Sequence, residues 1–196
     1  MLRALVVLIA VTWSAVIAAA DPLFDAAKSG DLPAIARLLA SGAAVNSRDR
    51  DQATPLIAAA LVGQGEAAKL LLAKGADIQA RNAGGFTALH AAAYAGSVPV
   101  ATLLLDKGAA RDDAENKAGV TAFFVAAEEN HPEFVEFMIS RGSDVAKTEG
   151  HGYSALTRAF WKGHKDMMRL LKRHGLACQA DKLSASELVQ CLAIKS

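Results

Sequence analysis

Hydrophobic residues recur along this chain at the spacing of short amphipathic helices. Leu70 and Leu71 follow Ala67 by three and four positions, and the segment 134–138 repeats this pattern. Residues three and four apart share one face of an α-helix, so the pattern predicts short helices with one buried side. Gly75 follows the first of these runs, and glycine is the residue that most easily takes the left-handed conformation that ends a helix.

A second kind of short helix is predicted where a run of small residues follows threonine or serine. Thr54 precedes Pro55, and the pair suits the N-cap and the first position of a helix. Paired alanines follow in most of these runs, and their small side chains allow neighbouring helices to approach closely. Glycines then break the runs, at Gly63, Gly96 and Gly163.

Both patterns repeat along the chain. The segment 54–60 recurs at 87–93, at 121–127 and more loosely at 154–160, with spacings of 33, 34 and 33 residues. The glycine-terminated runs recur in the same way, at 71–77, 104–109, 138–144 and 170–175. Self-similarity at a fixed period of this length is typical of stacked structural repeats.

The repeats resemble the ankyrin-repeat family, whose unit carries Thr-Pro-Leu-His and a later Leu-Leu-x-x-Gly-Ala. Here the matching runs include TPLI at 54–57, TALH at 87–90 and LLAKGA at 71–76. The resemblance implies an all-α solenoid in which each unit is a turn followed by two antiparallel helices. We expect a repeat domain over 21–180, with five repeats at about 21–48, 49–81, 82–115, 116–148 and 149–180.

The chain begins with an uncharged apolar segment that predicts export. Arg3 is followed by no charged residue until Asp21, and the segment ends in three alanines, a pattern that signal peptidase accepts. We expect residues 1–20 to be a signal peptide cleaved between Ala20 and Asp21; a membrane anchor is the alternative. Export implies the periplasm of a Gram-negative bacterium, with secretion as the alternative location. Asp21 would then cap the first helix of repeat one.

The C-terminal end is predicted to close the stack. Phe160 replaces the second alanine of the inner repeats, so another identical repeat would not fit there. Ser184 and Glu187 have the spacing of a capping box, which predicts a short helix within 181–196 as the C-terminal cap. Cys178 and Cys191 are the only cysteines, and in an exported chain they favour a disulfide, with two buried thiols as the alternative.

Charge excludes one class of partner. Cleavage would remove Arg3 from 21 basic residues and none of the 20 acidic ones, leaving equal numbers. No cluster of lysine and arginine provides the footprint of a nucleic-acid or anionic-membrane binder. The charged segment 109–117 contains the one-residue insertion of the 34-residue repeat. We expect a solvated turn tip there, because it lacks the ligand order of a calcium loop.

The histidines are expected to be structural. The resemblance implies that His90, His131 and His164 occupy family positions whose rings hold the fold together. His174 lies in the last turn of a helix, where a cation is favoured, and only His151 has no assigned structural role. No nucleophile or carboxylate is paired with a histidine at a spacing that catalysis requires. We therefore expect no enzyme activity, no cofactor and no metal site.

Binding of another protein is the predicted function. The resemblance implies that partners dock on the concave face, which the turn tips and the first helix of each repeat form. The aromatic residues favour this face, since tyrosine and tryptophan are frequent interface anchors. The alternative is that Phe86 and Tyr153 fill gaps between turns and that Trp161 lies under the C-terminal cap. The expected contacts are Arg50, Asp51, Phe86, Tyr94, Glu128, His151, Tyr153 and Trp161. A monomeric scaffold or adaptor is expected; the alternative is an inhibitor or immunity protein that neutralises an exported toxin or enzyme.

Overall fold

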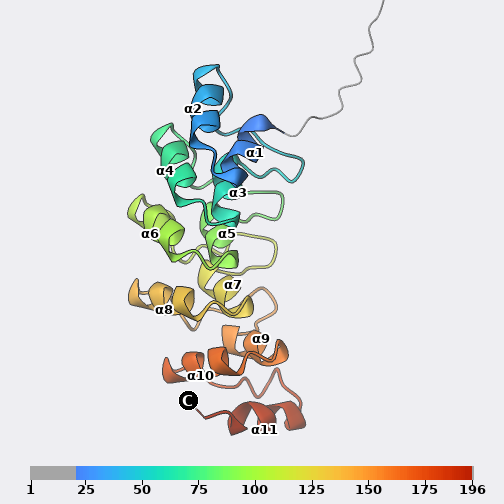
Figure 1. Ribbon diagram of the computed structural model, residues 1–196. Helices are drawn as coiled ribbons and strands as arrows, with labels where there is room; N and C mark the ends of the chain where they lie inside the picture. The colour runs from blue at the N-terminus through green and yellow to red at the C-terminus, as the bar shows by residue number, and fades with distance from the viewer. Residues whose placement is uncertain (1–20, 196) are drawn as a thin grey trace, which may run out of the picture.

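The computed structural model describes residues 21–195, which form a stack of helix pairs (Figure 1). The predicted signal peptide, residues 1–20, lies outside the described residues. The described helices are α1 (Pro22–Ser29), α2 (Leu32–Ala40), α3 (Pro55–Leu61), α4 (Gly65–Ala73), α5 (Ala88–Tyr94), α6 (Val98–Asp106), α7 (Ala122–Glu128), α8 (Pro132–Ser140), α9 (Ala155–Trp161), α10 (Lys165–Arg173) and α11 (Ala185–Ala193). The expectation of an all-α solenoid with a C-terminal capping helix is confirmed.

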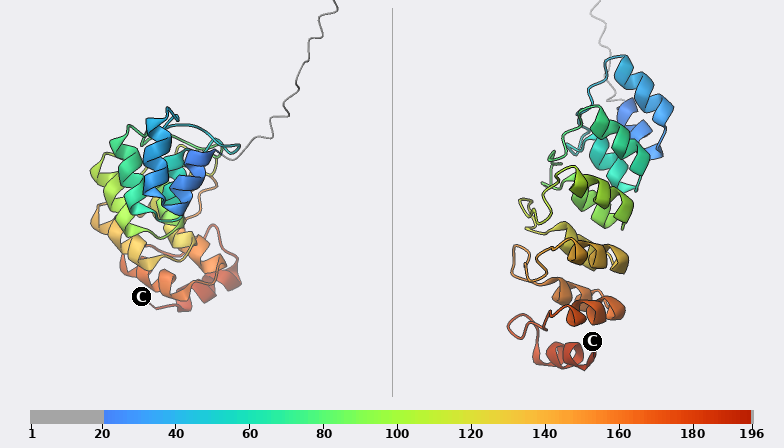
Figure 2. Two further views of the ribbon diagram at one scale, coloured as in Figure 1. Left: turned by 45° about the horizontal axis from the view of Figure 1, so that its top comes forward. Right: turned by 90° about the vertical axis from the view of Figure 1, so that its left-hand side faces the viewer.

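The helices form two layers with turns along one side. The odd-numbered helices from α1 to α9 stack in an inner layer, and the even-numbered helices from α2 to α10 stack in an outer layer (Figure 1). The turns between pairs project from one side of the stack, beside the inner layer (Figure 2). We call the surface formed by these turns and the inner helices the inner face. No described helix reaches the length and hydrophobicity that a membrane crossing requires.

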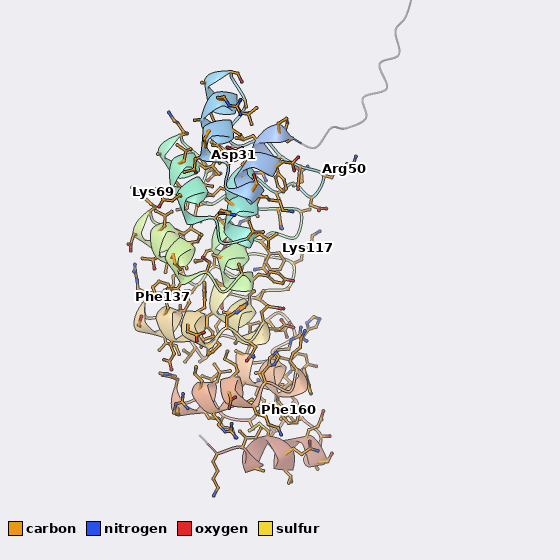
Figure 3. The ribbon with its side chains drawn as sticks, viewed as in Figure 1. Asp31, Arg50, Lys69, Lys117, Phe137 and Phe160 are labelled. Atoms are coloured by element: carbon orange, nitrogen blue, oxygen red, sulfur yellow. A yellow bond between two sulfur atoms is a disulfide. The ribbon has the colours of Figure 1, made fainter. Side chains whose placement is uncertain are left out.

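Alanines set the close spacing of the inner layer. Ala27, Ala60, Ala93 and Ala127 occupy the same position in four successive repeats, and none of them exposes any surface. Small side chains at a helix contact shorten the distance between helix axes, which lies in general at about 8–10 Å. Phe160 of α9 takes this position in repeat five, where its half-buried side chain lies on the side of α9 toward the C-terminal helix (Figure 3).

Side-chain caps define where the inner helices begin. Asp21 Oδ1 accepts a hydrogen bond from the Leu23 N–H at 2.9 Å, as its predicted N-cap role requires. Thr54, Thr121 and Ser154 each cap a later inner helix through a backbone N–H three residues on. These bonds satisfy donors that a helix start leaves without an intrahelical partner.

Left-handed residues end the inner helices. Gly96 has φ of +66°, and a Cβ atom added there would lie 2.6 Å from His131 Nδ1. In repeat four the equivalent residue is Asn130, with φ of +63°. Asparagine tolerates this conformation better than other non-glycine residues, which explains why the glycine pattern has a gap at that repeat.

The C-terminal cap is fixed by covalent and polar contacts. The predicted disulfide is present, with an S–S distance of 2.06 Å between Cys178 and Cys191. Lys172 Nζ donates to the carbonyl oxygens of Cys191 and Ile194, each at 2.6 Å, and burial lowers the pKa of this lysine. The predicted capping box starts α11, because Ser184 N donates to Glu187 Oε2 at 2.8 Å. The disulfide and the Lys172 hydrogen bonds therefore attach α11 to the last repeat, and the capping box fixes where α11 begins.

Candidate protein-binding groove

Three columns of equivalent residues run along the inner face. The helix column lies at or next to the end of each inner helix and consists of Lys28, Leu61, Tyr94, Glu128 and Trp161. The turn column lies just before each helix from repeat two onward and consists of Ala53, Phe86, Val120 and Tyr153. The floor column lies three residues before the helix column and consists of Ala58, Ala91, Val125 and Arg158.

A groove of about 540 Å³ lies among these columns. In repeats two and three the floor column contributes the small buried residues Ala58 and Ala91 to the lining of the groove. Leu61 and Tyr94 border it from the helix column, with 40% and 55% of their surface exposed. Val125 and Arg158 occupy the floor column in the next two repeats with larger side chains, so the open apolar part lies over repeats two and three.

The backbone of the helix column is held from the following repeat. His131 Nε2 donates to the Tyr94 carbonyl at 2.8 Å, and His164 Nε2 donates to the Glu128 carbonyl at 3.1 Å. A binding surface built on fixed backbone loses less entropy when a partner docks. The predicted structural roles of His131 and His164 are therefore confirmed, and they position the groove.

His90 joins the groove to the next turn. Its Nε2 donates to the Val120 carbonyl at 3.0 Å, and its Nδ1 accepts from the Thr87 hydroxyl at 2.9 Å. This bond pattern assigns a neutral ring with the proton on Nε2. Burial lowers the pKa of His90 below its ordinary value, so the neutral form is favoured. Its structural role is also as expected.

Each turn from repeat two onward is closed by one acceptor side chain, a feature that our sequence reasoning missed. These acceptors are Asp49, Asn82, Asn116 and Glu149, spaced 33, 34 and 33 residues apart. Asp49 Oδ1, for example, accepts from the backbone N–H of residue 51 at 2.9 Å and of residue 53 at 2.8 Å. The recurring short polar residue was the available signal, and Glu149 obscures it because its side chain is longer.

His151, to which the sequence assigned no structural role, has a structural partner. Its Nδ1 lies 2.9 Å from Glu149 Oε2, and its carbonyl accepts from Lys182 Nζ at 3.2 Å. Burial alone would raise the pKa of Glu149, but the hydrogen bonds from His151 and from two backbone N–H groups lower it overall. The Glu149 carboxylate therefore closes the turn in its charged form.

The expectation of a fully solvated turn in 109–117 is wrong for Asp113. Arg81 binds this carboxylate with both terminal nitrogens, at 2.8 and 3.2 Å, and only 4% of the Asp113 side chain is exposed. Burial opposes its ionisation, but the bond to Arg81 lowers the pKa of Asp113 overall. The Arg81 guanidinium supplies the positive charge at this turn. The described residues contain no cluster of side chains suited to a metal ion.

The predicted contact residues fall into separate groups. Asp51, Phe86, Tyr94 and Glu128 line the groove. Arg50 is exposed at a turn tip outside the lining (Figure 3). The remaining three contacts, His151, Tyr153 and Trp161, form a cluster at the C-terminal end.

Within this cluster the Tyr153 and Trp161 rings lie 4.8 Å apart, and the Tyr153 and His151 rings lie 6.4 Å apart. Trp161 Nε1 donates to Glu187 Oε1 of α11 at 3.1 Å. We call these residues the cap cluster. The bond to Glu187 agrees with the alternative that Trp161 lies under the C-terminal cap. Sequence reasoning missed Lys28, Ala58 and Ala91 as lining residues of the groove.

Comparison with known proteins agrees with this architecture. A family model described as Ankyrin repeats (3 copies) matches residues 23–114 and 109–182. No match was found among curated proteins. Every residue that lines the groove lies within the matched ranges.

Proposed function

The chain belongs to the ankyrin-repeat family, whose repeats are generic protein-interaction modules, and from this premise we propose that it binds one partner protein through the groove. The observation that carries the proposal is the open apolar part of the groove over repeats two and three. Tyr94 and Leu61 leave large apolar surface exposed there, beside the small residues Ala58 and Ala91. Exposed aromatic surface next to a hollow is typical of an interface anchor.

The role we propose is binding without catalysis. Three histidines, His90, His131 and His164, each donate to a backbone carbonyl. The other two, His151 and His174, each lie within hydrogen-bond distance of a glutamate. A general base needs a ring nitrogen that reaches a substrate, and these interactions favour a structural use of the rings.

We propose that the protein works in the periplasm after cleavage between Ala20 and Asp21. The leader sequence supports export, and the Cys178–Cys191 disulfide suits an oxidising compartment. Asp21 caps α1 directly, so cleavage at this bond would leave the first repeat intact.

Photo-cross-linking in the source cells tests the proposal. A benzoylphenylalanine replaces Tyr94 in one variant and Lys69 in the control variant, whose side chain is 66% exposed on the outer layer (Figure 3). We expect one discrete protein adduct from position 94 and none from position 69. Equal adducts from both positions, or none from position 94, would contradict the groove assignment.

The identity of the adduct also separates the two roles in question. An adaptor partner keeps its own activity when the purified protein is added. An exported toxin or enzyme that loses activity on binding would instead identify the protein as an inhibitor or immunity protein.

A further inference from the structure

The groove carries an uneven set of charges. Among its lining residues the cationic side chains are Lys28 and Arg158, and the carboxylates are Asp49, Asp51, Glu128, Glu129 and Glu149. The whole chain is nearly neutral, with a formal net charge of +1. The excess of carboxylates is therefore local to this surface.

Several of these charges are already compensated within the fold. Asp49 and Glu149 accept backbone N–H groups in their turns. Glu128 Oε1 lies 3.2 Å from Arg158 Nη2 and 3.7 Å from Lys162 Nζ.

Two carboxylates are left available at the groove. Asp51 and Glu129 are exposed, and neither forms an ion pair within residues 21–195. Lys28, at the first repeat, is the available cation of the lining and lies in the helix column one repeat before Leu61. Toward the C-terminus Arg158 and Lys162 are paired with Glu128, so Glu129 is the exposed lining carboxylate there without an ion pair in the described part of the chain.

We propose that the partner inserts an extended segment in which a large apolar residue and a lysine or arginine lie about three positions apart. This inference rests on the proposed binding function. The apolar side chain sits over Ala58 and Ala91 and contacts Tyr94, and the basic side chain reaches Glu129.

The spacing of the two residues follows from the stack. Tyr94 and Glu129 belong to neighbouring repeats, whose helices α5 and α7 are in contact. Packed helix axes lie about 8–10 Å apart, and an extended chain advances about 3.3 Å per residue. About three residues therefore span one repeat of the groove.

Selection from a displayed library of random 12-residue peptides tests this inference on the purified protein. We expect the enriched peptides to share a large apolar residue with a lysine or arginine three or four positions away. Enrichment of acidic peptides, of peptides without a basic residue, or of none would overturn the inference. The cross-linking result at Tyr94 stands apart from this selection, so the broader binding function is judged separately.

Substitutions in the groove then show where the most enriched peptide binds. Ala91→Arg copies the residue that this chain itself carries at the same position of repeat five, and it should weaken binding more than ten-fold. Glu129→Gln changes an exposed side chain and should weaken binding about three-fold, the scale of one exposed ion pair. The control Glu66→Gln alters a carboxylate that is 74% exposed on α4 and should leave affinity unchanged.

The variants test the groove assignment and the charge inference separately. Loss of binding in Ala91→Arg with full binding in Glu129→Gln would overturn the charge inference and keep the groove. Full binding in a folded Ala91→Arg variant would overturn both.

Discussion

Tyr94 and Trp161 occupy the same position in repeats three and five, yet their surroundings differ. Tyr94 is 55% exposed at the groove, and its carbonyl is held by His131 while its ring stays open to solvent. Trp161 is bonded to Glu187 of α11 and packs against Tyr153. Trp161 still exposes 41% of its surface, but the cap engages its indole N–H, whereas repeat three leaves the Tyr94 ring without such a partner among the described residues.

The same contrast holds for the floor column. Ala91 lines open space in repeat three, and Arg158 fills the equivalent space in repeat five and pairs with Glu128. The middle of the stack therefore offers an open groove, whereas the C-terminal end is filled by contacts that close the fold.

Removing the disulfide should cause the largest loss of stability, and this loss should fall on the last repeat and the cap. In a Cys178→Ala/Cys191→Ala variant we expect a loss of about 3 kcal/mol from the last repeat and cap, because the bridge closes a loop with a sequence separation of 13. Urea unfolding followed by circular dichroism measures this loss. A reductant should shift the wild type in the same direction and leave the variant unaffected; equal wild-type curves with and without reductant would contradict the prediction. Peptide binding at the groove should persist.

Gly96→Ala should damage the groove through its backbone. The left-handed conformation costs about 1–2 kcal/mol for alanine, and the new Cβ would also meet the His131 ring that holds the Tyr94 carbonyl. Gly163→Ala is the matched control, because Gly163 has φ of +76° and no atom near the added Cβ. Thermal unfolding should show a larger loss for Gly96→Ala, and partner binding should fall only in that variant. Equal losses would show that the His131 contact has no effect.

Trp161→Ala should lower stability, whereas Tyr94→Ala should leave it nearly unchanged. Trp161→Ala removes a hydrogen bond and an aromatic contact, so we expect a stability loss of about 1 kcal/mol. Tyr94→Ala changes an exposed ring and should alter the free energy of unfolding by less than about 0.5 kcal/mol. Urea unfolding compares them, and a greater loss for Tyr94→Ala would refute the distinction.

Acid should weaken the middle repeats through His90. Burial lowers its folded pKa below the ordinary value of 6.5, so the unfolded chain takes up a proton first. Stability is then complete above about pH 6.5 and declines as the pH falls toward the folded pKa. Protonation of Nδ1 also removes the acceptor for Thr87. Unfolding measured between pH 7.5 and 5 should show a smaller slope for His90→Gln; an unchanged slope would contradict this assignment.

The repeat architecture was readable from the sequence because each helix pair carries its own signals. Thr54 and Gly63 mark one helix by local chemistry, and the 33-residue period extends that assignment along the chain. The same register brought Tyr94 and Glu128 to one face. Local signals of this kind survive without knowledge of the tertiary contacts.

The groove itself was not predictable in the same way. Ala58 and Ala91 matter because they leave space, and a small residue carries no distinctive signal in an alanine-rich chain. The pairing of Arg81 with Asp113 joins two repeats, and the bond from Trp161 to Glu187 joins the last repeat to the cap. Such contacts depend on side-chain positions that periodicity does not specify.

The most direct test of the groove is the equilibrium affinity of the partner cross-linked from position 94 for two folded variants. Tyr94→Ala should weaken binding about ten-fold or more, as expected for an aromatic anchor, and Trp161→Ala should stay within about two-fold of the wild type. An undiminished affinity in Tyr94→Ala, or an equal loss in Trp161→Ala, would contradict the assignment of the groove as the binding surface.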